Sequence, residues 1–137
     1  PAKITGLDSS LDGKKLVVCA QGVPCGNATK QLAEKLGVTL SPVSEEQKVT
    51  DVRAKVESGE ADAGLVYATD AKAAGDKVEI IEIARADEVV NSYPIALTVS
   101  TKNKEAGQKF IDAVLSEKGQ AVLKKYGFSA PTSADKG

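Results

Sequence analysis

Short apolar runs alternate along the chain with segments in which apolar residues recur at helical spacing. The apolar or β-branched runs predict five strands, at residues 15–20, 40–43, 63–67, 78–84 and 95–99. The helical spacing predicts four helices, at residues 27–36, 50–59, 104–115 and 116–126. Strands that alternate with helices in this way are typical of an α/β domain with a mostly parallel sheet.

Residues suited to helix ends stand at both ends of these segments. Asn27, Thr50 and Ser116 can serve as N-caps, because their side chains accept a hydrogen bond from the first N–H groups of a helix. Glycine readily adopts the left-handed conformation that ends a helix, and three glycines follow the predicted helices: Gly37, Gly59 and Gly127.

The size and charge of the chain favour one globular domain without a nucleic-acid or membrane partner. Its 137 residues predict a single domain over residues 1–130, followed by a polar, flexible tail over residues 131–137. The 18 basic and 19 acidic residues leave a formal charge of -1, which gives no indication of nucleic acid or a lipid surface. The chain begins at Pro1 rather than Met, so we expect a processed or trimmed product.

Histidine is absent from the chain, which removes the most common general base and the most common metal ligand. Cys19 and Cys25 have five residues between them, a spacing that matches neither a CxxC redox site nor a zinc site. We expect a disulfide that closes a short loop, which implies an oxidising compartment. Two reduced, buried thiols in a cytosolic protein are the alternative. A redox pair or a Cys25 nucleophile would need an activating base, so we predict no enzymatic activity.

Four segments occur in the order found in one known family. They are VPCGNATKQLAEKLG (23–37), TDVRAKVESGEADAGLVYATDA (50–71), SYPIALTVSTKN (92–103) and FIDAVLSEKGQAVLKKYGF (110–128). Together they resemble the second half of the periplasmic molybdate-binding proteins of ABC importers, and VVCAQGVPCG (17–26) resembles a variant found in actinobacterial lipoprotein members. The resemblance implies a lobe of the type II periplasmic-binding-protein kind, with a mostly parallel sheet flanked by helices in three layers.

The resemblance also implies partners and a location. A molybdate or tungstate oxyanion would be the ligand, an ABC permease would be the protein partner, and no cofactor would be needed. The protein would act outside the cytoplasm, in the periplasm or anchored by lipid. The family's first lobe, which supplies hydroxyl ligands from serine, has no counterpart in this chain. Ser9 and Ser10 precede the first predicted strand and do not replace it.

The resemblance assigns an oxyanion site to neutral donors. The backbone N–H groups of Cys25 and Val52 and the hydroxyl of Tyr67 would hold the anion, and Gly26 would let the backbone approach it closely. Helix N-termini suit this role, because their first N–H groups have no partner in the helix. Tyr67 and Gly26 also have structural readings, as a residue at the rim of the core and as a turn glycine. The disulfide either fixes the Cys25 donor before the ligand arrives or only stabilises a short loop.

Other polar residues are assigned away from the ligand. Asp51 would stabilise the first turn of its helix, and Tyr93 and Pro94 would form part of the hinge toward the first lobe. Arg53 and Arg85 could form salt bridges or contact a partner.

Alternative functions remain open from the residues alone. Sulfate, phosphate or a small organic anion could occupy a related site, and the effector-binding domain of a transcription regulator could share the architecture. Because the first lobe would be absent, we expect weak ligand binding by this chain and a homodimer that covers its exposed apolar surface.

Overall fold

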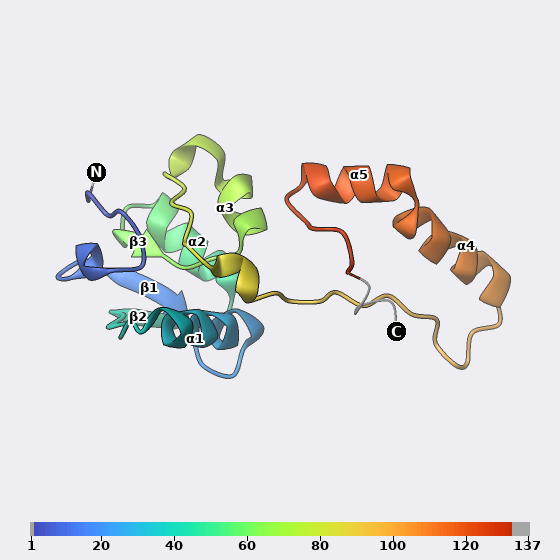
Figure 1. Cartoon of the computed structure of the whole chain (residues 1–137), viewed down its shortest axis with the longest axis horizontal. Helices are drawn as coiled ribbons and strands as arrows, with labels where there is room; N and C mark the ends of the chain where they lie inside the picture. The colour runs from blue at the N-terminus through green and yellow to red at the C-terminus, as the bar shows by residue number, and fades with distance from the viewer. Residues whose placement is uncertain (1, 133–137) are drawn as a thin grey trace. The chain divides into compact units, whose positions relative to one another are not determined.

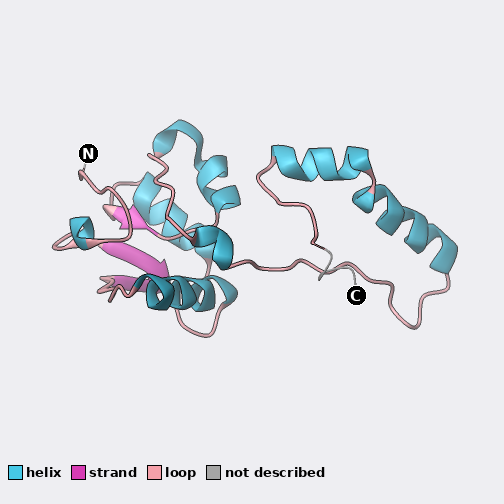
Figure 2. Cartoon of the chain, viewed as in Figure 1, coloured by secondary structure: helices cyan, strands magenta, loops and turns pink. Residues whose placement is uncertain are grey.

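The computed structural model describes residues 2–132, which divide into one unit up to Asn91 and a second from Ser92 onward (Figure 1). The first unit contains a parallel sheet in the order β2-β1-β3, and Figure 2 shows every described strand there. Its strands are β1 Leu16–Cys19, β2 Ser44–Glu46 and β3 Ala63–Gly64. Its helices are α1 Pro24–Leu36, α2 Val49–Glu57 and α3 Ala68–Ala74, with short 3-10 turns at Ser9–Leu11, Gly75–Lys77 and Ala86–Glu88. The predicted α/β class with a parallel sheet is confirmed.

Strand β1 is buried on both faces because a helix covers each side of the sheet. Alternate residues of a strand face opposite sides. Val17 and Cys19 pack in one cluster with Val52 of α2, whereas Val18 lines a hollow together with Ala33 of α1. Helices α1 and α2 therefore lie on opposite faces of the sheet, as Figure 1 shows. This three-layer arrangement explains the continuous apolar run of β1.

Two of the predicted strands are wrong, and two others differ in extent or position. Residues 78–84 and 95–99 form no strand, because no neighbouring strand is paired with them among residues 2–132. Large apolar side chains in these segments are exposed to solvent, Ile80 by 53% and Val99 by 100%. Strand β2 begins at Ser44, just after the predicted 40–43, and β3 covers two residues of the predicted five.

The predicted N-caps are corrected at two of three helices. Helix α1 begins at Pro24 with Val23 as N-cap, so Asn27 lies inside the helix and its side chain accepts from Gly22 N–H at 3.3 Å. Proline at the first helical position is favourable, because the N–H that it lacks would have no partner there. Helix α2 begins before Thr50, with Lys48 as N-cap.

The second unit contains helices α4 Lys104–Leu115 and α5 Glu117–Lys125, close to the predicted 104–115 and 116–126. Ser116 caps α5 as predicted, because its hydroxyl accepts from Gly119 N–H at 3.2 Å. The rings of Tyr93 and Phe128 meet edge to face at 5.7 Å between centroids. Neither helix has a buried residue, and Phe110 is 64% exposed. Most of the predicted tail at 131–137 lies outside the described residues.

A polar cluster joins the end of α1 to the segment after α3. The Arg85 guanidinium contacts Glu88 through Nε at 2.6 Å and Nη2 at 2.9 Å, and its Nη1 donates to the Lys35 carbonyl at 3.1 Å. Lys35 Nζ also contacts Glu88 at 3.2 Å. Hydrogen bonds from Arg85 and then Lys35 lower the pKa of Glu88 from 4.5 to about 2. Arg85 therefore acts in a salt bridge within this unit.

We predict that Glu88→Gln reduces the melting temperature at neutral pH and that this reduction disappears in acid. A carboxylate with a lowered native pKa stabilises the fold fully above its unfolded pKa of 4.5, and this contribution is lost as the pH falls toward about 2. Thermal melts by circular dichroism from pH 7 to pH 2 measure the difference. Glu82→Gln, which removes an exposed carboxylate nearby, is the control. A difference that stays constant with pH would contradict the prediction.

Candidate functional site

The carboxyl ends of the three parallel strands meet at one edge of the sheet, and each strand leads there into a helix. The connection after β1 leads to α1 on one face, whereas α2 covers the other face. In doubly wound sheets, ligands bind at the edge where successive connections turn to opposite faces. The residues predicted for the site all follow strand ends: Cys25 and Gly26 follow β1, Val52 follows β2 and Tyr67 follows β3.

The structure brings these residues into one cluster although they are up to 42 positions apart in the sequence. Cys25 and Val52 are buried in the same group as Cys19, and the side chain of Tyr67 packs against that group. The residues that the resemblance assigned to the site therefore lie in one packed cluster, and their role in binding stays a prediction.

The Cys19–Cys25 disulfide is confirmed, with the two Cα atoms 5.6 Å apart. It joins the last residue of β1 to the second residue of α1. The loop between them has its own bonds, from Val23 N–H to the Ala20 carbonyl at 3.4 Å and from Gly22 N–H to Asn27. The start of α1 is thus fixed before any ligand could bind.

The first turn of α1 presents backbone donors at this edge. The first backbone hydrogen bond of α1 runs from Asn27 N–H to the Val23 carbonyl, at 3.0 Å. The N–H groups of Cys25 and Gly26 precede that bond, and Pro24 has no N–H. Two adjacent N–H groups at a helix N-terminus carry partial positive charge and suit an anion. The donor role of Cys25 stays a prediction.

Gly26 is required by packing, whatever its part in ligand binding. A Cβ atom at Gly26 would lie 1.8 Å from the Ala20 carbonyl oxygen and 2.6 Å from its carbon. The backbone of α1 therefore touches the end of β1 with no room for a side chain. Sequence reasoning offered a close approach to ligand or a turn, and the structure adds this helix-to-strand contact as a third reason.

The first turn of α2 differs from that of α1. Val52 N–H already donates to the Lys48 carbonyl at 3.4 Å, longer than the usual 2.9–3.0 Å, and its side chain is 0% exposed. Asp51 N–H donates to the same carbonyl at 3.1 Å. The N–H of Thr50 precedes both bonds, so Thr50 is a candidate donor that the sequence resemblance did not indicate. Asp51 lies in the first turn as predicted.

Tyr67 is half-buried at the N-cap position of α3. Its hydroxyl oxygen accepts a hydrogen bond from Asn91 Nδ2 at 2.7 Å. Asn91 was not identified from the sequence, because it lies 24 positions away and carries no motif. In this bond the hydroxyl is an acceptor, and its role as a donor to the ligand stays a prediction.

Glu46 places a carboxylate at the same edge, and its charge is compensated. It ends β2 opposite Cys19, and its Oε1 contacts Lys55 Nζ of α2 at 2.5 Å and the Ser44 hydroxyl. The hydrogen bond from Lys55, followed by that from Ser44, lowers the pKa of Glu46. Arg53 forms a salt bridge with Glu57 within α2, with 2.9 Å between Arg53 Nε and Glu57 Oε1.

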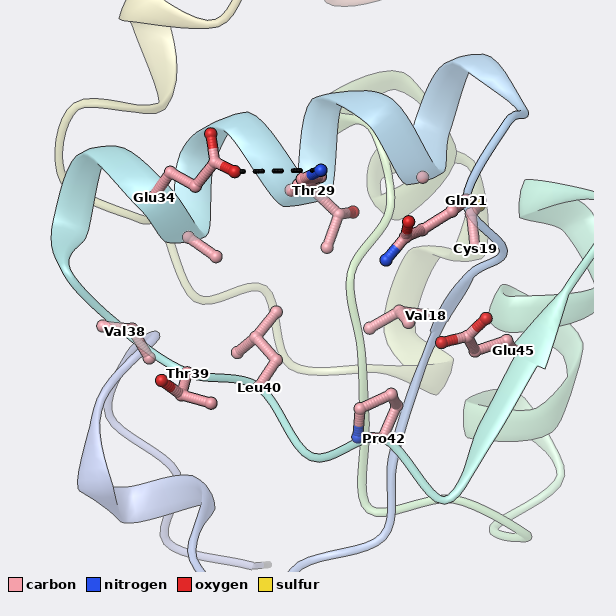
Figure 3. A pocket seen from close by; sticks show the side chains of 13 residues that line it. Val18, Cys19, Gln21, Thr29, Glu34, Val38, Thr39, Leu40, Pro42 and Glu45 are labelled. Carbon is pink, nitrogen blue, oxygen red and sulfur yellow. Dashed lines mark ion pairs between the residues drawn. The ribbon is translucent and has the colours of Figure 1, made fainter.

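A separate hollow of about 290 Å³ lies between α1 and the segment that leads into β2 (Figure 3). Thr29 and Leu40 point into it from opposite walls, and the Lys30–Glu34 ion pair at 4.0 Å lies on the helix above it. The hollow touches Cys19 and Gly26 but neither Val52 nor Tyr67. It lies on the α1 face of the sheet and is not the predicted site.

The chain is similar in sequence to known bacterial proteins. Residues 1–129 match the family described as bacterial extracellular solute-binding protein. The chain is 41% identical over 132 residues to the molybdate-binding protein ModA of Mycobacterium tuberculosis (strain ATCC 25618 / H37Rv), an alignment that covers 96% of this chain and 51% of that protein. Identity to Escherichia coli (strain K12) ModA is 31% over 129 residues, covering 91% and 50%. The chain thus spans about half the length of these relatives. No solved structure matches it significantly.

We predict that Gly26→Ala destabilises the first unit by about 3 kcal/mol or more, because its Cβ would overlap the Ala20 carbonyl and the backbone would have to move. Urea unfolding followed by circular dichroism measures the change. Gln31→Ala places the same residue on the exposed side of the same helix and should change stability little. Equal stability of the two variants would show that α1 can shift away from β1 at no cost.

Proposed function

The chain belongs to the bacterial extracellular solute-binding protein family, and on that premise we propose that it is one lobe of an ABC-importer component that binds molybdate. The observation that carries the proposal is 41% identity, across 96% of the chain, to a molybdate-binding protein. Tungstate, which has the same charge and shape, would occupy the same site. The proposed role is binding without chemical conversion, and no cofactor takes part.

The site supports this proposal through the kind of donors that it offers. The backbone N–H groups of Cys25 and Gly26, the first turn of α2 and the hydroxyl of Tyr67 are all neutral. An oxyanion without protons accepts hydrogen bonds only, so neutral donors match it, and they leave no unpaired cation when the site is empty. The compensated charge of Glu46 limits repulsion of the anion at this edge.

The remaining donors would come from a second lobe. The relatives are about twice as long as the aligned region, and this chain corresponds to half of them. We propose that the anion is enclosed between this edge and a lobe of similar size that contributes the other half of the donors. The ABC permease would then recognise the closed form.

The proposed compartment is outside the cytoplasm. The disulfide is suited to an oxidising environment, and the family's members are extracellular by description. Among residues 2–132, no helix combines the length and hydrophobicity needed to cross a bilayer.

We predict that Tyr67→Phe, in the longer two-lobed protein, weakens molybdate binding by about 1.5–3 kcal/mol, since it removes one hydrogen bond to a charged acceptor and keeps the ring. Titration calorimetry with molybdate, tungstate, sulfate and phosphate measures affinity and selectivity. Tyr126→Phe is the matched control, because it removes the hydroxyl of an exposed tyrosine at the C-cap position of α5. Molybdate binding no tighter than that of sulfate or phosphate would overturn the proposed ligand.

We predict that the chain alone binds molybdate weakly or not detectably. One lobe supplies only part of the donors, and water competes for the exposed side of the anion. Calorimetry on this chain, with light scattering to give its mass, tests the prediction. A monomer that binds molybdate at submicromolar concentration would show that one lobe is sufficient.

A further inference from the structure

We infer that Val23, the N-cap residue of α1, is a positioning residue that keeps the first N–H groups of α1 free for the oxyanion, which then caps the helix in place of a side chain. This inference rests on the proposed function, because it concerns the same site. Its starting point is that α1 begins without a side-chain cap, although Val23 has the extended backbone of an N-cap residue, with φ -97° and ψ 155°.

A capping side chain and the ligand would use the same donors. In a capped helix, the side-chain oxygen of the N-cap residue accepts from the N–H of the second or third helical residue. In α1, which begins at Pro24, these are the N–H groups of Cys25 and Gly26. They are also two of the groups proposed to hold the oxyanion. A capping side chain at position 23 would therefore compete with the ligand.

Valine at position 23 leaves both donors without an acceptor from the protein. Its side chain has no polar atom and packs against the buried cluster that contains Cys25. Among residues 2–132, no backbone or side-chain atom accepts a hydrogen bond from Cys25 N–H or Gly26 N–H. Both residues are buried, Cys25 with 8% exposed, and N–H groups in buried residues nearly always have an acceptor. An acceptor from outside the chain therefore completes this turn.

The N-cap residues of the other helices show how this choice is distributed. Helix α2, whose first turn belongs to the same site, has Lys48 as N-cap, and a lysine side chain cannot accept a hydrogen bond. Ser116 caps α5, and Asp8 caps the first 3-10 turn, whereas Asn103 at α4 makes no side-chain cap. Both α1 and α2, whose first turns form the proposed site, thus have N-cap residues whose side chains cannot accept.

The uncapped start makes the first turn of α1 less stable by itself. A valine N-cap stabilises a helix less than serine, threonine or aspartate, and Gly26 lowers the helix propensity of the turn further. The disulfide offsets this cost, because it ties Cys25 to Cys19 at the end of β1 without using an N–H group. The turn is thus held by a bond that leaves its donors free.

Val23→Thr tests whether a cap at this position takes the donors. Threonine has the branched shape of valine and adds a hydroxyl that can accept. In this chain, amide hydrogen exchange measured by NMR should slow at Cys25, at Gly26 or at both. Val56→Thr is the matched control, because Val56 packs against the same cluster but lies in the last turn of α2. It should leave the exchange of both amides unchanged.

The second measurement is molybdate affinity in the two-lobed protein, by titration calorimetry. Val23→Thr and Val23→Ser should each weaken binding about fivefold, the factor by which a typical N-cap side chain favours the capped state. Val23→Ala removes packing but adds no acceptor, so it should weaken binding less than either. Val56→Thr should leave the affinity unchanged.

Unchanged amide exchange in both Val23→Thr and Val23→Ser would overturn the inference, as would an unchanged molybdate affinity in both. An affinity loss for Val23→Ala as large as that for Val23→Thr would also overturn it, because the loss would then arise from packing rather than from competition for the donors. Failure of the unaltered two-lobed protein to bind molybdate would instead overturn the proposed function, and the exchange measurement does not depend on that result.

Discussion

The contact between Gly26 and the Ala20 carbonyl is the constraint on which the site depends. It brings the backbone of α1 directly against the end of β1, and the Cys19–Cys25 disulfide holds the same two elements together one residue away. Close packing fixes the direction in which the first N–H groups of α1 point, and the covalent bond keeps the loop from opening. Steric contact and a covalent bond thus act at one place, so the first turn of α1 is already ordered in the absence of ligand.

In the proposed site, an anion would be held by dipoles rather than by full charges. Two ion pairs involve residues of β2 and α2, Glu46 with Lys55 and Arg53 with Glu57. The groups proposed to hold the ligand are neutral: backbone N–H groups and the hydroxyl of Tyr67. A preformed set of neutral donors avoids the cost of burying an unpaired cation, and it depends on geometry, which makes the residues that fix geometry as important as the donors.

The sequence predicted the class of fold and most helices because these depend on local patterns. The buried strand at Val17, the helix ends at Gly37 and Ser116, and the disulfide could all be inferred from spacing and residue type. Strands were wrongly predicted at 78–84 and 95–99, because a run of β-branched residues forms a strand only where a partner strand pairs with it. Cys25 and Tyr67 were identified through the resemblance, whereas the contact of Asn91 with Tyr67 required the structure, since it depends on how distant segments pack.

The exposed apolar residues of the second unit affect the stability of its helices. Helices α4 and α5 have 12 and 9 residues, lengths that are marginal for an isolated helix in water, and neither buries a residue in this chain. Any surface that covers Phe110 or Tyr126 would supply much of the free energy that keeps these helices folded. By mass action, the helicity of this unit should then depend on the concentration and affinity of that surface as well as on local helix propensity. Order in the second unit would report whether the chain is associated.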